Sequence, residues 1–128
     1  MIEIHIDGAS KNNNVKGAVR RASICVVVLS ENINIIEQIG DKTNNQAEWE
    51  ALIEVLRIAQ HQNWKELKIY SDSKLVVEQF NDRWDVKNDE LLLSYIVAKT
   101  LAGLFDMVDL QWISRSQNLA GIELERRT

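Results

Sequence analysis

The sequence predicts an α/β fold in which a five-stranded mixed sheet is flanked by helices, in the element order β-β-β-α-β-α-α-β-α. Two observations favour this class. Strand-like segments joined by short polar links fill residues 2–40, and helix-like and strand-like segments alternate after them. Because short links join antiparallel strands while helical crossovers join parallel ones, such a sheet contains both kinds of pairing.

The first three strands are expected at residues 2–7, 17–29 and 33–40. In the first, Ile2, Ile4 and Ile6 alternate with polar residues, which is the period of a strand with one buried face. Lysines and asparagines at 11–16 indicate a turn. The second strand ends in an apolar run, and a short link at 31–32 leads to the third. This spacing indicates an antiparallel meander.

Helical periodicity begins near residue 45. Between 45 and 61, apolar residues recur three and four positions apart over much of the helix surface, so this helix is expected to pack on the sheet and on another helix. A strand at 67–71, a short helix at 74–80, a longer helix at 89–104, a strand at 107–113 and a short helix at 119–127 complete the order.

Size and composition indicate one domain over residues 1–128. Hydrophobic residues make up 45% of the chain, enough for a core, and no segment is apolar for long enough to cross a bilayer. The N-terminus lacks the basic region of a signal peptide, and Cys25 is the only cysteine, in an apolar run that suits a buried structural thiol. We therefore expect a cytoplasmic protein without disulfides or membrane contact.

The charge of the chain bears on its partners. The net charge is −4 and the pI about 5.2. This argues against strong non-specific binding to nucleic acid, which depends on many lysine and arginine contacts to phosphates. A metal-assisted nuclease stays compatible with this charge, because bound cations offset the acidic residues of a site.

Three acidic residues stand where a site would form in such a sheet. Asp7 and Asp72 each follow a short strand-like run, and Glu48 lies in the first turn of the predicted helix. The carboxyl ends of parallel strands share one edge of a sheet, and carboxylates that converge there suit a hard cation such as Mg²⁺ or Mn²⁺. Each also has a structural alternative: Asp7 as a turn former, Glu48 in a capping box with Asn45, and Asp72 as a helix cap.

Four segments carry a resemblance to a known family. They read Ile-Asp-Gly-Ala-Ser at 6–10, Thr-Asn-Asn-Gln-Ala-Glu-Trp-Glu-Ala-Leu at 43–52, Ser-Asp-Ser-Lys-Leu-Val-Val at 71–77 and Trp-Ile-Ser-Arg-Ser-Gln-Asn at 112–118. In this order and spacing they resemble the signatures of the ribonuclease H type 1 family. The resemblance covers nearly the whole chain. It implies the ribonuclease H-like fold and cleavage of the RNA strand of RNA–DNA hybrids to 5′-phosphate and 3′-hydroxyl ends.

The resemblance also implies roles for individual residues. Asp7, Glu48 and Asp72 match the catalytic carboxylates that hold two divalent cations, Mg²⁺ or Mn²⁺, with Asp7 bridging both ions. Glu48 can also accept a hydrogen bond from a ribose 2′-hydroxyl, the group that distinguishes RNA from DNA. The expected contacts to the hybrid come from the positions after Asp7, from the start of the first helix and from the last signature: Gly8, Ala9, Ser10, Thr43, Asn44, Asn45 and Arg115.

The chain departs from the family pattern in its last signature. Counted from Asn118, the family's fourth carboxylate falls on Ile122, which cannot bind a metal. The adjacent Glu123 would point about 100° away on a helix, so we do not expect it to compensate. The basic, tryptophan-rich insertion that some members carry is also absent, and so is the family's usual catalytic-loop histidine. These losses are expected to weaken one metal site and to make binding to the hybrid modest and salt-sensitive.

Two alternatives to this enzyme stay open. The missing fourth acid and the negative charge are compatible with a non-catalytic module that binds nucleic acid or protein. Another nuclease on the same fold, such as a junction resolvase or an exonuclease, is disfavoured by the signature at 43–48. Nothing in the sequence specifies an oligomeric state.

Overall fold

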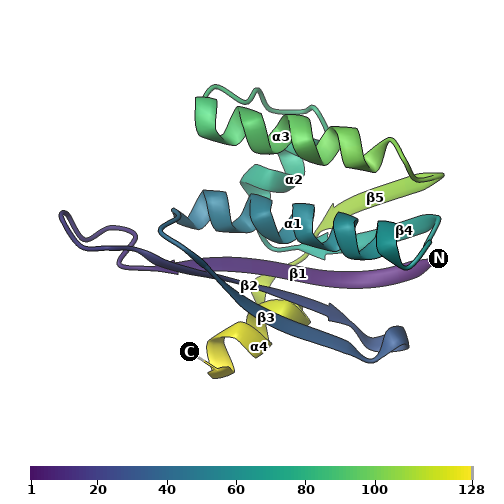
Figure 1. Cartoon of the computed structure of the whole chain (residues 1–128), viewed down its shortest axis with the longest axis horizontal. Coiled ribbons are helices and arrows are strands. Elements are labelled where there is room, and N and C mark those ends of the chain that lie inside the picture. The colour runs from purple at the N-terminus through teal and green to yellow at the C-terminus, as the bar shows by residue number, and fades with distance from the viewer. Residues whose placement is uncertain (128) are drawn as a thin grey trace.

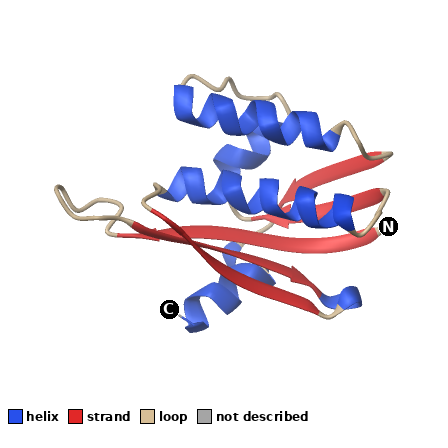
Figure 2. Cartoon of the chain, in the orientation of Figure 1, coloured by secondary structure: helices blue, strands red, loops and turns tan. Residues whose placement is uncertain are grey.

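A five-stranded mixed sheet forms the centre of the molecule (Figures 1 and 2). The structure is a computed structural model and describes residues 1–127. The strands lie in the order β3-β2-β1-β4-β5. Their bounds are β1 Ile2–Lys11, β2 Arg21–Val28, β3 Ile33–Gly40, β4 Glu66–Ser71 and β5 Met107–Trp112. β1, β2 and β3 pair antiparallel, whereas β4 pairs parallel with β1 and with β5, which confirms the predicted fold class.

The helices lie on both faces of the sheet. α1 (Asn44–His61), α2 (Lys74–Phe80) and α3 (Asp89–Ala102) lie on one side, and α4 (Leu119–Arg127) lies on the other (Figure 1). Alternate residues of β2 serve the two sides: Ile24 and Val26 join the core under α1, whereas Cys25 and Val27 pack against Leu124 of α4. No helix within residues 1–127 has the length and apolar character needed to cross a membrane.

The first hairpin differs from the expected one. β1 continues four residues beyond Asp7, and residues 17–20, which were predicted as strand, belong to the connection. Pairing with β2 causes the extension, because the register runs on to the pair Lys11↔Arg21. The connection turns through positive φ angles at Asn12 (63°) and Gly17 (79°). The small and polar residues after Asp7 are therefore held as a strand by pairing with β2, which the local sequence pattern does not reveal.

The caps of α1 and α2 show whether Glu48 and Asp72 serve as helix-capping residues. Thr43 caps α1: its hydroxyl accepts from the N–H of Gln46, and the Gln46 side chain accepts from the Thr43 N–H. Ser73 caps α2 by accepting from Val76. The capping box is therefore made without Glu48, which lies beyond the first turn, and Asp72 is not the cap of α2. Both acids are free of the structural roles considered above.

Candidate active site

Strand register places Asp7 and Asp72 level with each other. The parallel pairs of β1 and β4 run from Ile2↔Leu67 to His5↔Tyr70. Two residues beyond this last pair, the chain reaches Asp7 in β1 and Asp72 just after β4. Asp7 was expected at the end of its strand, but it lies inside β1, at the point where β4 stops pairing with it. The site thus forms at the carboxyl end of β4, over the middle of β1.

Glu48 reaches this point because α1 lies directly on β1. The N–H of Gly8 donates to Oε1 of Glu48 at 2.6 Å. A Cβ at position 8 would lie 2.3 Å from the backbone of Ala47, well inside van der Waals contact, so only glycine allows this approach. Gly8 therefore sets how closely the helix can bring Glu48 to Asp7.

Asp7, Glu48 and Asp72 form one cluster. Each offers a carboxylate oxygen, and these oxygens lie within 4.8 Å of one another. Burial, together with the charge of Asp72, raises the pKa of Asp7 to about 6. Burial and then the charges of Asp7 and Asp72 raise the pKa of Glu48 well above its usual range. Oxygen ligands that repel one another in this way favour a hard divalent cation between them, so the cluster fits Mg²⁺ or Mn²⁺.

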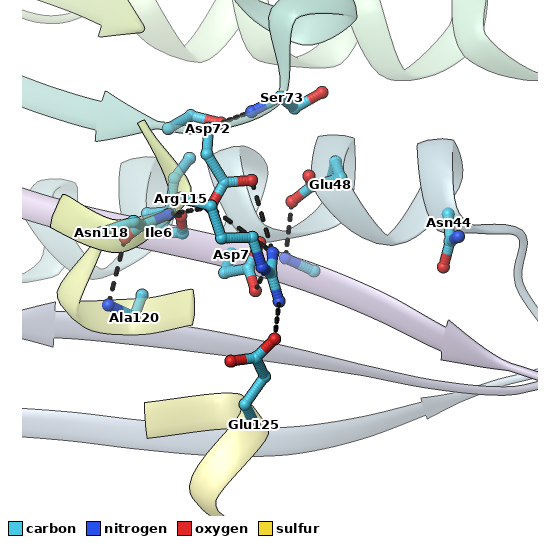
Figure 3. Close-up of polar contacts among 12 residues, drawn as sticks. Ile6, Asp7, Asn44, Glu48, Asp72, Ser73, Arg115, Asn118, Ala120 and Glu125 are labelled. Carbon is cyan, nitrogen blue, oxygen red and sulfur yellow. Dashed lines mark hydrogen bonds and ion pairs between the residues drawn. The ribbon is translucent and has the colours of Figure 1, made fainter. Parts of the chain in front are cut away.

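Arg115 is the cationic partner of this cluster within the described residues (Figure 3). Its Nη1 lies 3.3 Å from Oδ2 of Asp7 and 3.5 Å from Oδ1 of Asp72. Its Nη2 lies 3.4 Å from Oε1 of Glu125 on α4. The sequence predicted Arg115 as a contact to nucleic acid, and here its guanidinium lies among the acids. A divalent cation between Asp7 and Asp72 would compete with it for the same oxygens.

Asn118 orients Asp72, a role that the sequence reasoning did not assign. Its side chain is fully buried, and its amide N–H groups donate to Oδ2 of Asp72 at 2.8 Å and to the carbonyl of Ile6 at 2.9 Å. Its side-chain oxygen accepts from the N–H of Ala120 and so caps the start of α4. The signal was present in the last signature, where an asparagine ends the run Arg115 to Asn118.

α4 carries Ile122 at the position of the expected fourth acid, and two glutamates that point in different directions. Ile122 is 45% exposed, and as an aliphatic side chain it offers no ligand atom. Glu123 forms ion pairs with Arg126 and Arg127, which keeps it away from the site, as its spacing predicted. Glu125 faces the site through Arg115 (Figure 3), which the sequence reasoning had not considered.

The predicted nucleic-acid contacts lie mostly beside α1. Oδ1 of Asn44 accepts from the N–H of Ser10 at 2.6 Å, and the N–H of Asn44 donates to Asn13. A polar hollow opens next to this pair, lined by Asn13, Thr43, Asn44, Asn45, Gln46, Asn88, Glu90 and Leu91. Two predicted contacts lie elsewhere: Arg115 lies among the acids, and Ala9 packs against the apolar cluster of Cys25 on the α4 side.

Relatives of known classification match most of the chain. The reverse transcriptase-like family matches residues 6–126. The bifunctional protein Rv2228c of Mycobacterium tuberculosis is 38% identical over 120 residues, which are 91% of this chain and 32% of that protein. Ribonuclease HI of Halobacterium salinarum is 31% identical over 121 residues, which are 91% of this chain and 58% of that protein. The chain therefore spans only part of the length of either relative.

Solved structures agree with these relatives. The N-terminal RNase H domain of Rv2228c has a TM-score of 0.79 at 32% identity, covering 98% of this chain and 94% of that one. RNase H1 of Halobacterium salinarum has a TM-score of 0.85 at 28% identity, with 96% and 92% covered. LC11-RNase H1 in complex with an RNA/DNA hybrid has a TM-score of 0.84 at 27% identity, with 97% and 93% covered. The chain belongs to the reverse transcriptase-like family, and its fold is that of the ribonuclease H domains.

Proposed function

We propose that this protein is a divalent-metal-dependent endoribonuclease that cleaves the RNA strand of RNA–DNA hybrids and leaves 5′-phosphate and 3′-hydroxyl ends. The observation that carries the proposal is the convergence of Asp7, Glu48 and Asp72, whose oxygens lie within 4.8 Å of one another. The likeness to ribonuclease HI and to a ribonuclease H1 that binds an RNA/DNA hybrid supports the choice of substrate.

Asp7, Glu48 and Asp72 would hold the metal, as two ions of Mg²⁺ or Mn²⁺. When bound, such ions lower the pKa of water and stabilise the charge that develops on a phosphate under attack. Asp7 would be the central ligand, because it interacts with both of the other acids, Glu48 and Asp72. Glu48 is held by the Gly8 N–H through Oε1. Asn118 fixes the orientation of Asp72, which leaves that carboxylate little freedom to turn.

The substrate would lie across the start of α1 and the end of β5. Thr43, Asn44 and Asn45 line the polar hollow together with Asn88, and their amide and hydroxyl groups suit the phosphates of the DNA strand. The backbone at Gly8 and Ser10 lies between this hollow and the acids.

At the other side of Asp72, the exposed Trp112 ring donates through Nε1 to the Asp72 carbonyl. Lys74 lies 5.6 Å from the centre of that ring. An exposed aromatic ring beside a lysine suits contact with a sugar or base and with a phosphate. Once Arg115 turns away from the acids, its guanidinium can also reach a phosphate.

The second candidate function is a non-catalytic module that binds nucleic acid. Two observations favour it: Ile122 replaces the expected fourth acid, and the Arg115 guanidinium already contacts Asp7 and Asp72. A protein of this kind would bind the hybrid with no requirement for metal and would not cut it.

Cleavage of an end-labelled RNA–DNA hybrid separates the two functions. The assay compares Mg²⁺, Mn²⁺ and EDTA, with Asp7→Asn beside the wild-type protein. Metal-dependent cutting that the variant lacks would support the enzyme. Binding of the hybrid without cutting, at high protein and low salt with either metal, would refute the enzyme and support the binding module. Double-stranded and single-stranded RNA serve as substrate controls.

A further inference from the structure

α4 touches the acidic cluster at Gly121. A Cβ at this position would lie 3.2 Å from Oδ2 of Asp72 and 3.4 Å from Oδ2 of Asp7. The helix backbone therefore lies against both carboxylates, with no side chain in between. A residue one turn further along the same face of α4 can therefore direct its side chain toward the acids or toward a cation beside them.

Glu125 lies on that face of α4. It follows Gly121 by four residues, which is a rotation of about 40° past one full turn, so the two positions share a face one turn apart. Glu123, two residues after Gly121, lies on a different face and is bound by Arg126 and Arg127. Glu125 is thus the one acid of α4 that the helix presents to the site.

The contacts of Arg115 show that Glu125 and the cluster already share one cation. A single guanidinium lies 3.3 Å from Asp7, 3.5 Å from Asp72 and 3.4 Å from Glu125. The Glu125 side chain is 69% exposed, so it can change rotamer without disturbing the core. If a divalent cation displaces the guanidinium, Glu125 is left as the adjacent carboxylate without its partner.

We infer that Glu125 supplies the fourth carboxylate of the divalent-cation site, from one turn beyond the position that Ile122 occupies. This inference rests on the proposed function, because it requires that the cluster binds metal. By this inference the metal site keeps four carboxylates, with the fourth at residue 125 instead of residue 122.

Calorimetric titration of Mn²⁺ and Mg²⁺ tests the assignment without relying on activity. Glu125→Gln should weaken binding at least tenfold, because the loss of a ligand costs no less than the loss of a group that only supports a ligand, which is worth about 10- to 100-fold. Glu123→Gln is the matched control, since it removes an acid of the same helix that faces away, and it should bind as the wild type does. Ile122→Asp added to Glu125→Gln should recover the lost affinity. Thermal unfolding confirms that each variant is folded.

The same titrations in an Arg115→Gln background separate ligation from an indirect effect. If Glu125 binds the cation, Glu125→Gln still weakens binding when Arg115 is absent. If Glu125 acts only by drawing Arg115 away from Asp7 and Asp72, its effect vanishes in this background and the inference is wrong. Unchanged metal affinity in Glu125→Gln would overturn the inference and leave the proposed function standing. A wild-type protein that binds neither metal would overturn both.

Discussion

Asp7 is fully buried and has charged neighbours of both signs. Burial and the charge of Asp72 raise its pKa to about 6 from 3.8, and Arg115 opposes the shift without cancelling it. A carboxyl group with a raised pKa in the folded state binds its proton more tightly there than in the unfolded chain. The stabilisation that protonated Asp7 gives to the folded state is therefore complete below about pH 4 and is lost as the pH rises through about 6.

The Asp7→Asn variant should remove this dependence on pH. In EDTA at pH 8 we expect it to be more stable than the wild type by about 3 kcal/mol, because a pKa difference of one unit corresponds to about 1.4 kcal/mol and the rise of the Asp7 pKa to about 6 already includes the opposing effect of Arg115. At pH 4 the two proteins should be nearly equal. Urea unfolding at both pH values measures the difference. A variant that is less stable at pH 8 would show that the Asp7–Arg115 contact outweighs burial.

The three acids could be recognised from the sequence, whereas their surroundings could not. Asp7, Glu48 and Asp72 each stand in a short signature, and the structure brings them together. The location of Arg115 among the acids depends on where the segment after β5 crosses the ends of β1 and β4. No local pattern fixes that path. The same holds for Glu125, whose direction follows from how α4 lies against the sheet.

At the scale of elements, the contact between β1 and α1 decides the geometry of the site. These two elements approach each other closely at Gly8, where an added Cβ would lie 2.3 Å from backbone atoms of Ala47 and 2.6 Å from the N–H nitrogen of Glu48. Backbone atoms cannot move aside as a flexible side chain can. The strand and the helix would have to separate to admit a methyl group.

Gly8→Ala should therefore destabilise the protein by about 3 kcal/mol, the upper end of the usual cost of overpacking. It should also weaken metal binding, because Glu48 moves away with α1. Gly103→Ala is the control: the nearest atom to a Cβ there lies at 3.4 Å, and its backbone is in the right-handed helical region. Thermal unfolding and Mn²⁺ titration of both variants measure the two effects. Equal stabilities would contradict the close approach described here.

Most element positions follow from periodicity; α3 ends at Ala102, two residues before the predicted end, and the first hairpin is the larger exception. The strand at 33–40 and the helices at 74–80 and 119–127 lie where the pattern places them. β1 extends beyond its alternating segment because β2 pairs with Gly8, Ala9 and Ser10. Cross-strand partners are distant in sequence, so a window along the chain does not reveal them.

For the molecule as a whole, the negative charge limits how it can hold a polyanion. Acidic residues outnumber the 15 lysines and arginines and give a net charge of −4, and Lys74 and Arg115 are the cationic side chains that the described contacts place beside the acids. Neutral groups around Thr43, Asn44 and Asn88 supply hydrogen bonds that release no counterions. Binding should therefore depend on few charge contacts and on the metal.

The salt dependence of hybrid binding measures this number of contacts. With about three phosphates neutralised, affinity should fall roughly 40-fold between 50 and 200 mM salt, far less than for a strongly basic nuclease. Fluorescence anisotropy with the Asp7→Asn variant avoids cleavage during the measurement. Adding Lys74→Gln should lower the slope by about one contact, whereas Lys65→Gln, at the opposite end of β4 from Asp72, should leave it unchanged. A steep slope with no response to Lys74→Gln would place the interface elsewhere.

The buried amide of Asn118 has a consequence for synthesis of the protein. It joins Asp72 to the carbonyl of Ile6, a residue 112 positions earlier in the chain. A nascent chain that ends with β5 already contains Asp7, Glu48 and Asp72, but the group that orients one of them is still missing. We therefore expect the cluster of Asp7, Glu48 and Asp72 to reach its final arrangement only after the segment that follows β5 has been synthesised and has packed against Ile6.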